Sequence, residues 1–141
     1  MILNRIAIIG LGSIGRRHLR LMSEIRPDIE IIAVRSGHGN PCDEEKTAVR
    51  VVYSISDAIK EGIQAAIISS PATLHLEQSL ELAMNGIHLL IEKPISDKSN
   101  EVDKLLRVVN ENNITAMVGY VLRYDPGAIK FKNWLSDKVI G

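Results

Sequence analysis

The segment Gly10-Leu11-Gly12-Ser13-Ile14-Gly15 decides the fold of this chain. It has the pattern G-x-G-x-x-G and directly follows a short apolar run at residues 6–9. After it, residues 14–25 place apolar side chains at helical spacing, with arginines on the opposite face. A strand, a tight turn and a helix are therefore expected in that order, which is the context that a dinucleotide-binding turn requires.

The three glycines of this turn have separate expected roles. Gly10 permits the tight turn, Gly12 lets a diphosphate approach the backbone, and Gly15 lets the helix pack closely on the strand. The free N–H groups and the dipole of the helix, which begins around Ser13 and Ile14, then face the phosphate charge. The alternative is a glycine-rich turn that binds nothing. The strand-turn-helix context favours the dinucleotide site.

Short apolar runs and helical segments alternate along the rest of the chain. Further strands are expected at 29–34, 51–53, 65–68, 87–91 and 114–118. Helices are expected at 55–61, after Pro71, and around 102–109, whereas 35–46 is polar and rich in turn residues and is expected to be a loop or a short irregular segment. Because the strands are almost entirely apolar, both faces of the sheet should be covered. The prediction is an α/β fold, a doubly wound parallel sheet of the Rossmann type, over residues 1–120.

The composition excludes several classes of function. Of 141 residues, 45% are apolar, and 17 Lys and Arg balance 17 Asp and Glu. A balanced charge gives no electrostatic footprint for nucleic acid or for a membrane surface. Cys42 is a single cysteine, so no internal disulfide is possible. No apolar stretch approaches the roughly 18 residues of a membrane span. We expect a cytoplasmic protein, with no metal site.

The end of the second expected strand bears on the choice of cofactor. An NAD site usually has an Asp or Glu there, about 20 residues after the turn, to hold the ribose hydroxyls. This sequence has Arg35 and Ser36 instead. A cation and a hydroxyl suit a 2′-phosphate better than an acid would, so the sequence favours NADP over NAD. The alternative is that Arg35 stacks on adenine or points to solvent.

Three later motifs complete the pattern. They are Ser-Ser-Pro-Ala-Thr-Leu-His at 69–75, Glu-Lys-Pro at 92–94 and Gly-Tyr-Val-Leu-Arg-Tyr-Asp-Pro at 119–126. The first two follow expected strands, at the sheet edge where open α/β folds bind ligands. With the glycine turn, they make the chain resemble the glucose-fructose oxidoreductase / inositol dehydrogenase / rhizopine catabolism (Gfo/Idh/MocA) family along its whole length.

The resemblance implies a catalytic role for Lys93. In that family the Glu-Lys-Pro lysine lies beside the nicotinamide and the substrate, and the bond before the proline is often cis. Such a lysine can give a hydrogen bond or a proton to the oxygen that changes oxidation state. Glu92 is expected to orient Lys93 or to contact the cofactor ribose. The alternative for Lys93 is a surface lysine after a strand.

The resemblance also implies cofactor contacts from Ser70, Pro71, His75 and Arg123. The first three match the family's turn along the cofactor, although His75 falls in the first turns of a helix, which favours a structural role. Arg123 is retained from an Asn-x-Arg pattern that has lost its asparagine here. Three further histidines have no partner that the sequence can name: His18, His38 and His88.

Family members continue into a second, α+β domain that binds substrate. Here a helix is expected at 128–137, and we expect residues 121–141 to be a connecting helix and the start of a truncated second domain. Ile129, Trp134 and Leu135 would then need a covering surface. The alternative is that this helix packs against the nucleotide domain. The 141 residues alone are expected to bind cofactor with little or no turnover.

The function expected from the resemblance is that of an NAD(P)-dependent oxidoreductase. It would transfer hydride between a nicotinamide cofactor and a hydroxyl or carbonyl of a sugar, nucleotide sugar or cyclitol, as a homo-oligomer in its full-length form. Two alternatives stay open. One is a stand-alone NAD(P)-binding redox sensor, which Lys93 disfavours because a sensor needs no lysine at the nicotinamide end. The other is a reductase of a non-sugar carbonyl or imine.

Overall fold

A six-stranded parallel sheet forms the centre of the protein. The computed structural model describes residues 3–97 and 101–139. The strand order is β3-β2-β1-β4-β5-β6, and every neighbouring pair is parallel. The strands are β1 (Arg5–Ile9), β2 (Glu30–Val34), β3 (Arg50–Val52), β4 (Ala65–Ile68), β5 (His88–Ile91) and β6 (Ala116–Val118). The doubly wound parallel sheet expected from the apolar runs is confirmed.

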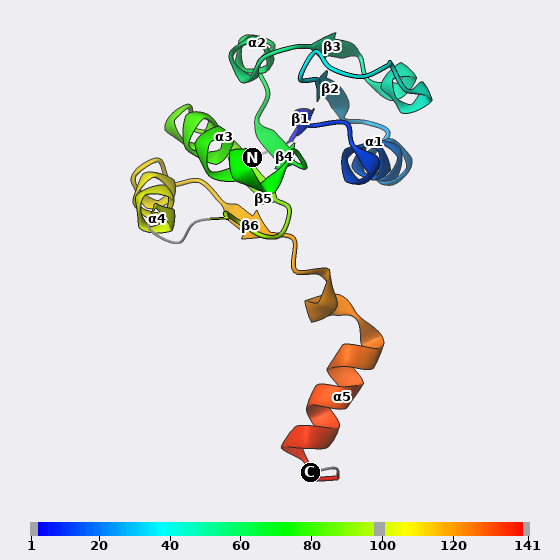
Figure 1. Ribbon diagram of the computed structural model, residues 1–141, viewed down its shortest axis with the longest axis vertical. Coiled ribbons are helices and arrows are strands. Elements are labelled where there is room, and N and C mark those ends of the chain that lie inside the picture. Colours follow the sequence, from blue (N-terminus) through cyan, green and yellow to red (C-terminus); the bar gives the residue numbers. More distant parts are fainter. Residues whose placement is uncertain (1–2, 98–100, 140–141) are drawn as a thin grey trace.

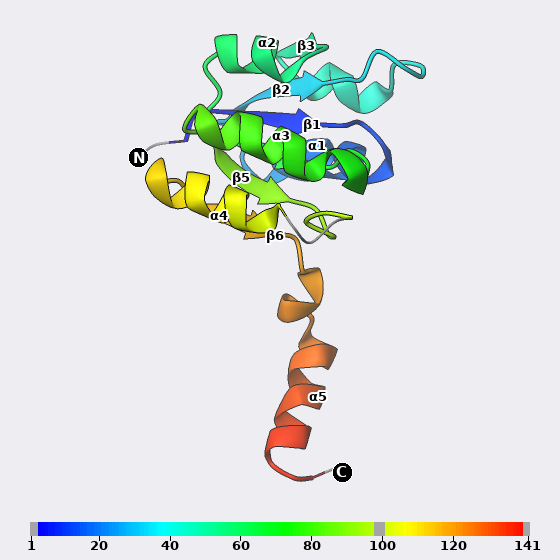
Figure 2. The same cartoon turned by 60° about the vertical axis from the view of Figure 1, so that its left-hand side comes forward.

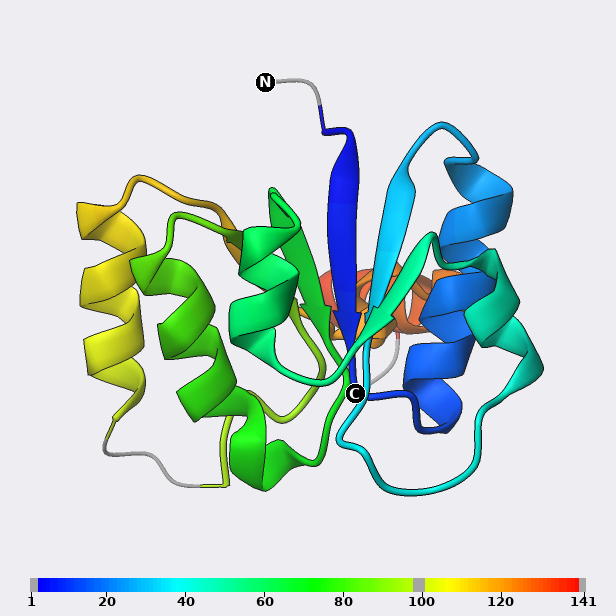
Figure 3. The same ribbon diagram turned by 90° about the horizontal axis from the view of Figure 1, so that it is seen from above.

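Helices cover both faces of this sheet. Figure 3 shows α1 (Ser13–Ile25) on one face, and α2 (Ile55–Lys60), α3 (Ala72–Met84) and α4 (Val102–Glu111) on the other. The strands alternate accordingly: Ala7 and Ile9 belong to the core under α2, α3 and α4, whereas Ile6 and Ile8 pack with Leu19 of α1. All of these side chains are at most 2% exposed. Burial on both faces explains why the strands are apolar after their first residues, which are Arg5, Glu30, Arg50 and His88 in four of them.

The segment between β2 and β3 is more regular than its sequence indicates. It contains a short 3-10 helix, η1 (Asp43–Thr47), within a stretch whose expected conformation was a loop or an irregular segment. The Glu45 carboxylate accepts a hydrogen bond from the Cys42 backbone N–H at 3.0 Å. Acidic residues fill the first turn of η1, where the helix dipole favours negative charge. These local contacts hold η1 in place, since its sequence has no apolar periodicity.

The C-terminal helix lies apart from the sheet. After η2 (Val121–Tyr124) comes α5 (Pro126–Ser136). Its N-terminus is capped by Asp125, whose carboxylate accepts a hydrogen bond from the Ala128 N–H at 2.7 Å. Figures 1 and 2 show α5 extending away from the domain, so the alternative in which it packs there is wrong. Its apolar side chains Ile129, Trp134 and Leu135 are between 41% and 49% exposed. Among residues 3–97 and 101–139, none of the helices has the length and apolarity to cross a membrane.

Candidate functional site

The turn between β1 and α1 and the first turn of α1 each contain a glycine that no other residue can replace without strain. Gly10 has a φ of +84°, and a Cβ there would lie 2.7 Å from the Ser70 backbone. A Cβ on Gly15 would lie 1.8 Å from the Gly10 carbonyl oxygen and 2.8 Å from Ser69 Oγ. The Ser69 hydroxyl lies 2.9 Å from the carbonyl oxygens of both Ile9 and Gly10. Gly10 and Gly15 therefore let β1, α1 and the chain after β4 approach one another.

Gly12 differs from both of these glycines. It precedes α1 with extended backbone angles, φ −67° and ψ −171°, and no side chain caps the helix. A Cβ on Gly12 would have no heavy atom within 4 Å, so the space beside this residue is open. The N-terminus of a 13-residue helix, with its orphan N–H groups and positive dipole end, faces that space. This geometry suits an anion.

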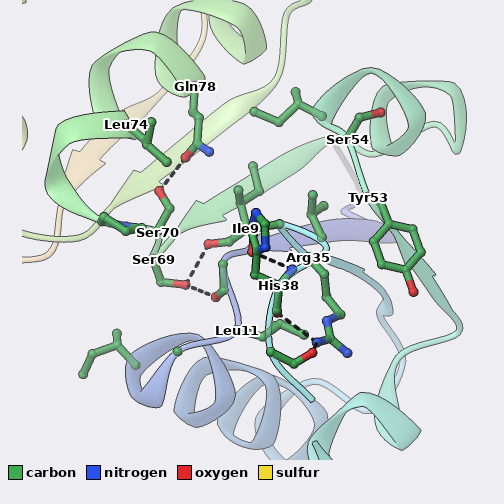
Figure 4. A pocket seen from close by; sticks show the side chains of 18 of the residues that line it. Ile9, Leu11, Arg35, His38, Tyr53, Ser54, Ser69, Ser70, Leu74 and Gln78 are labelled. Atoms are coloured by element: carbon green, nitrogen blue, oxygen red, sulfur yellow. Dashed lines mark hydrogen bonds between the residues drawn. The ribbon is translucent and has the colours of Figure 1, made fainter. Parts of the chain in front are cut away.

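The open space belongs to a cleft of about 710 Å³ at the carboxyl ends of β1, β2 and β4. That volume lies within the range of small-molecule and cofactor sites. Figure 4 shows Ser69, Ser70 and Gln78 at one end, and Arg35 and Tyr53 at the other. Of the residues expected at the cofactor site, the lining contains Gly10, Gly12, Ser13, Ile14, Arg35, Ser36, Ser70 and Pro71.

Several lining residues were not expected at the cofactor site from the sequence. They come from three places: the segment after Ser36, the start of α2, and the exposed face of α3. They include His38, Asn40, Glu45, Tyr53, Ser54, Leu74, Glu77, Gln78 and Glu81. The Ser70 hydroxyl donates to Gln78 Oε1 at 2.5 Å, which fixes the wall of the cleft beside Pro71. Two signals were available in the sequence. Ser54 is a typical cap residue before α2, and Gln78 follows Pro71 by seven residues, about two turns of helix, so it lies on the same face of α3.

Arg35 lies at the adenosine end expected for the cleft, but it is already engaged. The side chain is 8% exposed, and its guanidinium donates to the carbonyl oxygens of His38 (3.2 Å) and Gly39 (2.7 Å). Glu45 Oε1 lies 3.2 Å from Nη1 of the same group. Arg35 thus neither points to solvent nor stands free to receive a ligand, whereas Ser36 is exposed at the rim.

His75 is a buried brace between two motifs. It is 2% exposed, and its Nδ1 and Nε2 lie 2.8 Å from the Pro94 carbonyl oxygen and 2.7 Å from the Ser70 carbonyl oxygen. The ring therefore ties the turn after β4 to the Glu-Lys-Pro segment. His75 does not line the cleft, and its buried contacts fit the structural role that the sequence favours.

The Glu-Lys-Pro segment follows β5, and its Lys93–Pro94 peptide bond is cis. The Glu92 carboxylate accepts from, or pairs with, His18 Nε2 at 2.8 Å, with the two side chains 17% and 20% exposed. His18, for which no partner was expected from the sequence, thus links α1 to this segment. Lys93 is exposed, and neither it nor Arg123 of η2 lines the cleft.

Two groups near the cleft have shifted pKa values. Burial, and then the neighbouring Glu45 side chain, raise the pKa of the Cys42 thiol, which favours a protonated, unreactive cysteine. Lys60 and Ser54 lower the pKa of Asp57 in α2. Within the part of the chain that the structure describes, no cluster of three or more His, Cys, Asp or Glu could hold a metal ion.

Comparison with known proteins agrees with this geometry. The family model described as "Oxidoreductase family, NAD-binding Rossmann fold" matches residues 4–120. The chain is 30% identical to 2,7-anhydro-N-acetylneuraminate hydratase of Mediterraneibacter gnavus, covering 96% of this chain and 36% of that protein. It is 26% identical to scyllo-inositol 2-dehydrogenase (NAD(+)) of Bacillus subtilis, covering 97% and 41%.

The solved structures extend the likeness to three dimensions. The crystal structure of myo-inositol 2-dehydrogenase from Lactobacillus plantarum superposes with a TM-score of 0.86 at 27% identity, covering 99% of this chain and 43% of that one. The chain therefore spans about two fifths of the length of the proteins it matches.

Proposed function

The chain belongs to the Gfo/Idh/MocA oxidoreductase family, and on that premise we propose that it holds the diphosphate of a nicotinamide dinucleotide at the N-terminus of α1. The observation that carries this proposal is the open space beside Gly12. There the backbone can approach a ligand with no side chain in the way, directly above the positive end of a helix. The neighbouring glycines, Gly10 and Gly15, are fully explained by packing, and Gly12 is not.

The residues present fit such a ligand along its length. Gly12, Ser13 and Ile14 would hold the diphosphate through backbone N–H groups. Arg35 and Ser36 would lie at the adenosine ribose. Ser70 and Pro71 would lie along the nicotinamide half of the dinucleotide, between the glycine turn and the end of β5. The family's NAD-binding Rossmann fold supports this assignment.

For the chemistry, Lys93 is the residue that we propose as catalytic. The bound nicotinamide would accept or donate hydride at a carbon of a sugar, nucleotide sugar or cyclitol. Lys93 would hold or give the proton at the oxygen on that carbon. Glu92, fixed by His18 at 2.8 Å, would orient Lys93, and Arg123 would lie at the nicotinamide end. Because Lys93 is exposed to water in this chain, we expect cofactor binding with little turnover from the 141 residues alone.

NADP is the finer proposal for the cofactor. An acid at the end of β2 would repel a 2′-phosphate, and Arg35 and Ser36 stand there instead. We also propose that residues 1–120 are the dinucleotide-binding domain and that 121–141 form a connector. A homo-oligomeric full-length enzyme is part of the same proposal.

A cofactor titration tests the proposal. NADH and NADPH are added to the folded chain, and binding is followed by calorimetry and by the fluorescence of the reduced nicotinamide. Saturable binding of at least one of them is expected. If neither binds at millimolar concentration while circular dichroism shows a folded chain, the diphosphate site does not exist. Lys104→Ala serves as the control, because this exposed side chain of α4 lies outside the cleft and its loss should leave the affinity within about twofold.

A further inference from the structure

Arg35 is the cation on which a 2′-phosphate would depend. Among the described residues that line the cleft it is the one Lys or Arg side chain, whereas Glu45, Glu77 and Glu81 contribute carboxylates. A phosphate monoester carries about −1.5 to −2 charges at neutral pH and is bound most strongly by a guanidinium that can donate to it. The state of Arg35 therefore decides how well such a group is received.

In this structure the guanidinium is occupied from two sides. Two backbone carbonyls hold Nη2, and the Glu45 carboxylate holds Nη1 at 3.2 Å. The pair is shielded, since the two side chains are 8% and 12% exposed. A charge pair in that environment is neutral as a whole and is screened little by salt.

Glu45 is itself fixed in place by the local structure. Its Oε1 accepts from the Cys42 N–H at 3.0 Å and lies 3.5 Å from the Cys42 thiol. This contact belongs to the cap of η1, so the carboxylate does not swing freely away from Arg35. A 2′-phosphate that reached the guanidinium would have to compete with an anion that is already well placed.

We propose that Glu45 determines the selectivity between NADP and NAD by occupying the guanidinium that a 2′-phosphate requires. The inference rests on the proposed cofactor site and deepens it. A ribose with a free 2′-hydroxyl brings no charge and leaves the Arg35–Glu45 pair intact. A ribose with a 2′-phosphate must displace Glu45, and NADP binding is weakened by that competition. Glu45, ten positions downstream of Arg35, thus reduces the preference for NADP that Arg35 confers.

Affinities for NADH and NADPH in two charge-matched variants test this role. Glu45→Gln removes the competing charge while keeping an oxygen that can accept from the Cys42 N–H. Asp43→Asn removes the same charge from the same short helix, where Asp43 pairs with Lys46 and is 92% exposed. We expect Glu45→Gln to tighten NADPH binding about tenfold and to change NADH binding less than about twofold. Asp43→Asn should change neither by more than about twofold.

The outcomes separate this inference from the proposal beneath it. If neither NADH nor NADPH binds the unmodified chain, the proposed cofactor site is refuted. Binding of both, with NADPH affinity unchanged in Glu45→Gln or raised equally in Asp43→Asn, overturns the role of Glu45 and leaves the site standing.

A measurement on the unmodified chain covers the case in which Glu45→Gln does not fold. The Cys42 amide is protected by its bond to Glu45, so displacement of that carboxylate should speed amide hydrogen exchange at Cys42. NADPH should produce this acceleration and NADH should not. Equal exchange at Cys42 with the two cofactors overturns the competition.

Discussion

Replacing Gly12 and Gly15 separately by alanine distinguishes a glycine that serves the ligand from one that serves the fold. Both lie within one turn of chain, and each change adds the same single methyl group. The structure places those two methyl groups in opposite surroundings: open space beside Gly12 and tightly packed backbone beside Gly15. The two variants should therefore lose different properties.

For Gly15→Ala the cost falls on stability. The added Cβ would lie 1.8 Å from the Gly10 carbonyl oxygen, about half an ordinary contact distance, and 2.8 Å from Ser69 Oγ. Because the nearest obstacle is backbone, α1 must move away from β1, and this loosens the packing of Leu19 against the sheet. Overpacking of this kind costs about 3 kcal/mol or more, a large part of the stability of a domain this size.

For Gly12→Ala the cost falls on binding. The backbone angles at Gly12 are allowed for alanine and its Cβ touches nothing, so the free energy of unfolding should change by no more than about 1 kcal/mol. In the bound state that methyl group would occupy the path of the diphosphate. We expect the affinity for NADH or NADPH to fall by about 10-fold to 100-fold.

The assay pairs urea unfolding, followed by circular dichroism, with titration of the reduced cofactor. Gly15→Ala should unfold at a clearly lower urea concentration, and Gly12→Ala should unfold close to the unmodified chain but bind weakly. The reasoning is refuted if Gly12→Ala binds the cofactor like the unmodified chain, or if Gly15→Ala is as stable as Gly12→Ala.

Three further predictions concern capping, titration and the link to β5. Ser54→Ala removes the hydroxyl that accepts from the Asp57 N–H at 3.0 Å, and the unfolding free energy should fall by about 1 kcal/mol in urea titrations. Lys60 and Ser54 lower the pKa of Asp57 from 3.8, so the ionised carboxylate stabilises the fold fully above its unfolded pKa and loses this effect as the pH falls through its folded pKa. The difference in unfolding free energy between the unmodified chain and Asp57→Asn should therefore shrink at low pH. A difference that stays constant with pH would contradict this. A double-mutant cycle of His18→Ala and Glu92→Ala should give a coupling energy of about 1 kcal/mol, against zero for side chains that do not interact.

The fold was predictable because its signals are local. Each strand is an apolar run bounded by polar or turn residues, and most expected boundaries fall within two residues of those observed. The parallel, doubly wound arrangement follows from alternating strands and helices, with a glycine turn opening the first helix. The 3-10 helix at 43–47 has no such signal, because local side-chain contacts, such as that of Glu45 with Cys42, hold it in place of an apolar face.

The partners of the site residues were less accessible from the sequence. The glycine turn was identified from its neighbours in the chain, and Ser70 and Pro71 were identified from the resemblance of their motif to the family. The partner of His18 lies 74 residues away, directly after a strand whose position is set by the whole sheet. Arg35 shows the same limit at short range: its residue type indicated a phosphate contact, but whether its charge is free depends on how the segment up to Glu45 folds back.

The two halves of the proposed site are mechanically connected through His75. One ring nitrogen lies 2.7 Å from the carbonyl oxygen of Ser70, which lines the cleft, and the other lies 2.8 Å from the carbonyl oxygen of Pro94, next to Lys93. The cleft wall and Lys93, the lysine proposed as catalytic, therefore cannot shift independently without breaking a buried contact. Since His18 of α1 holds Glu92, the Glu-Lys-Pro segment is tied on both sides to elements that line the cleft. A cofactor placed by α1 would for this reason also be placed relative to Lys93.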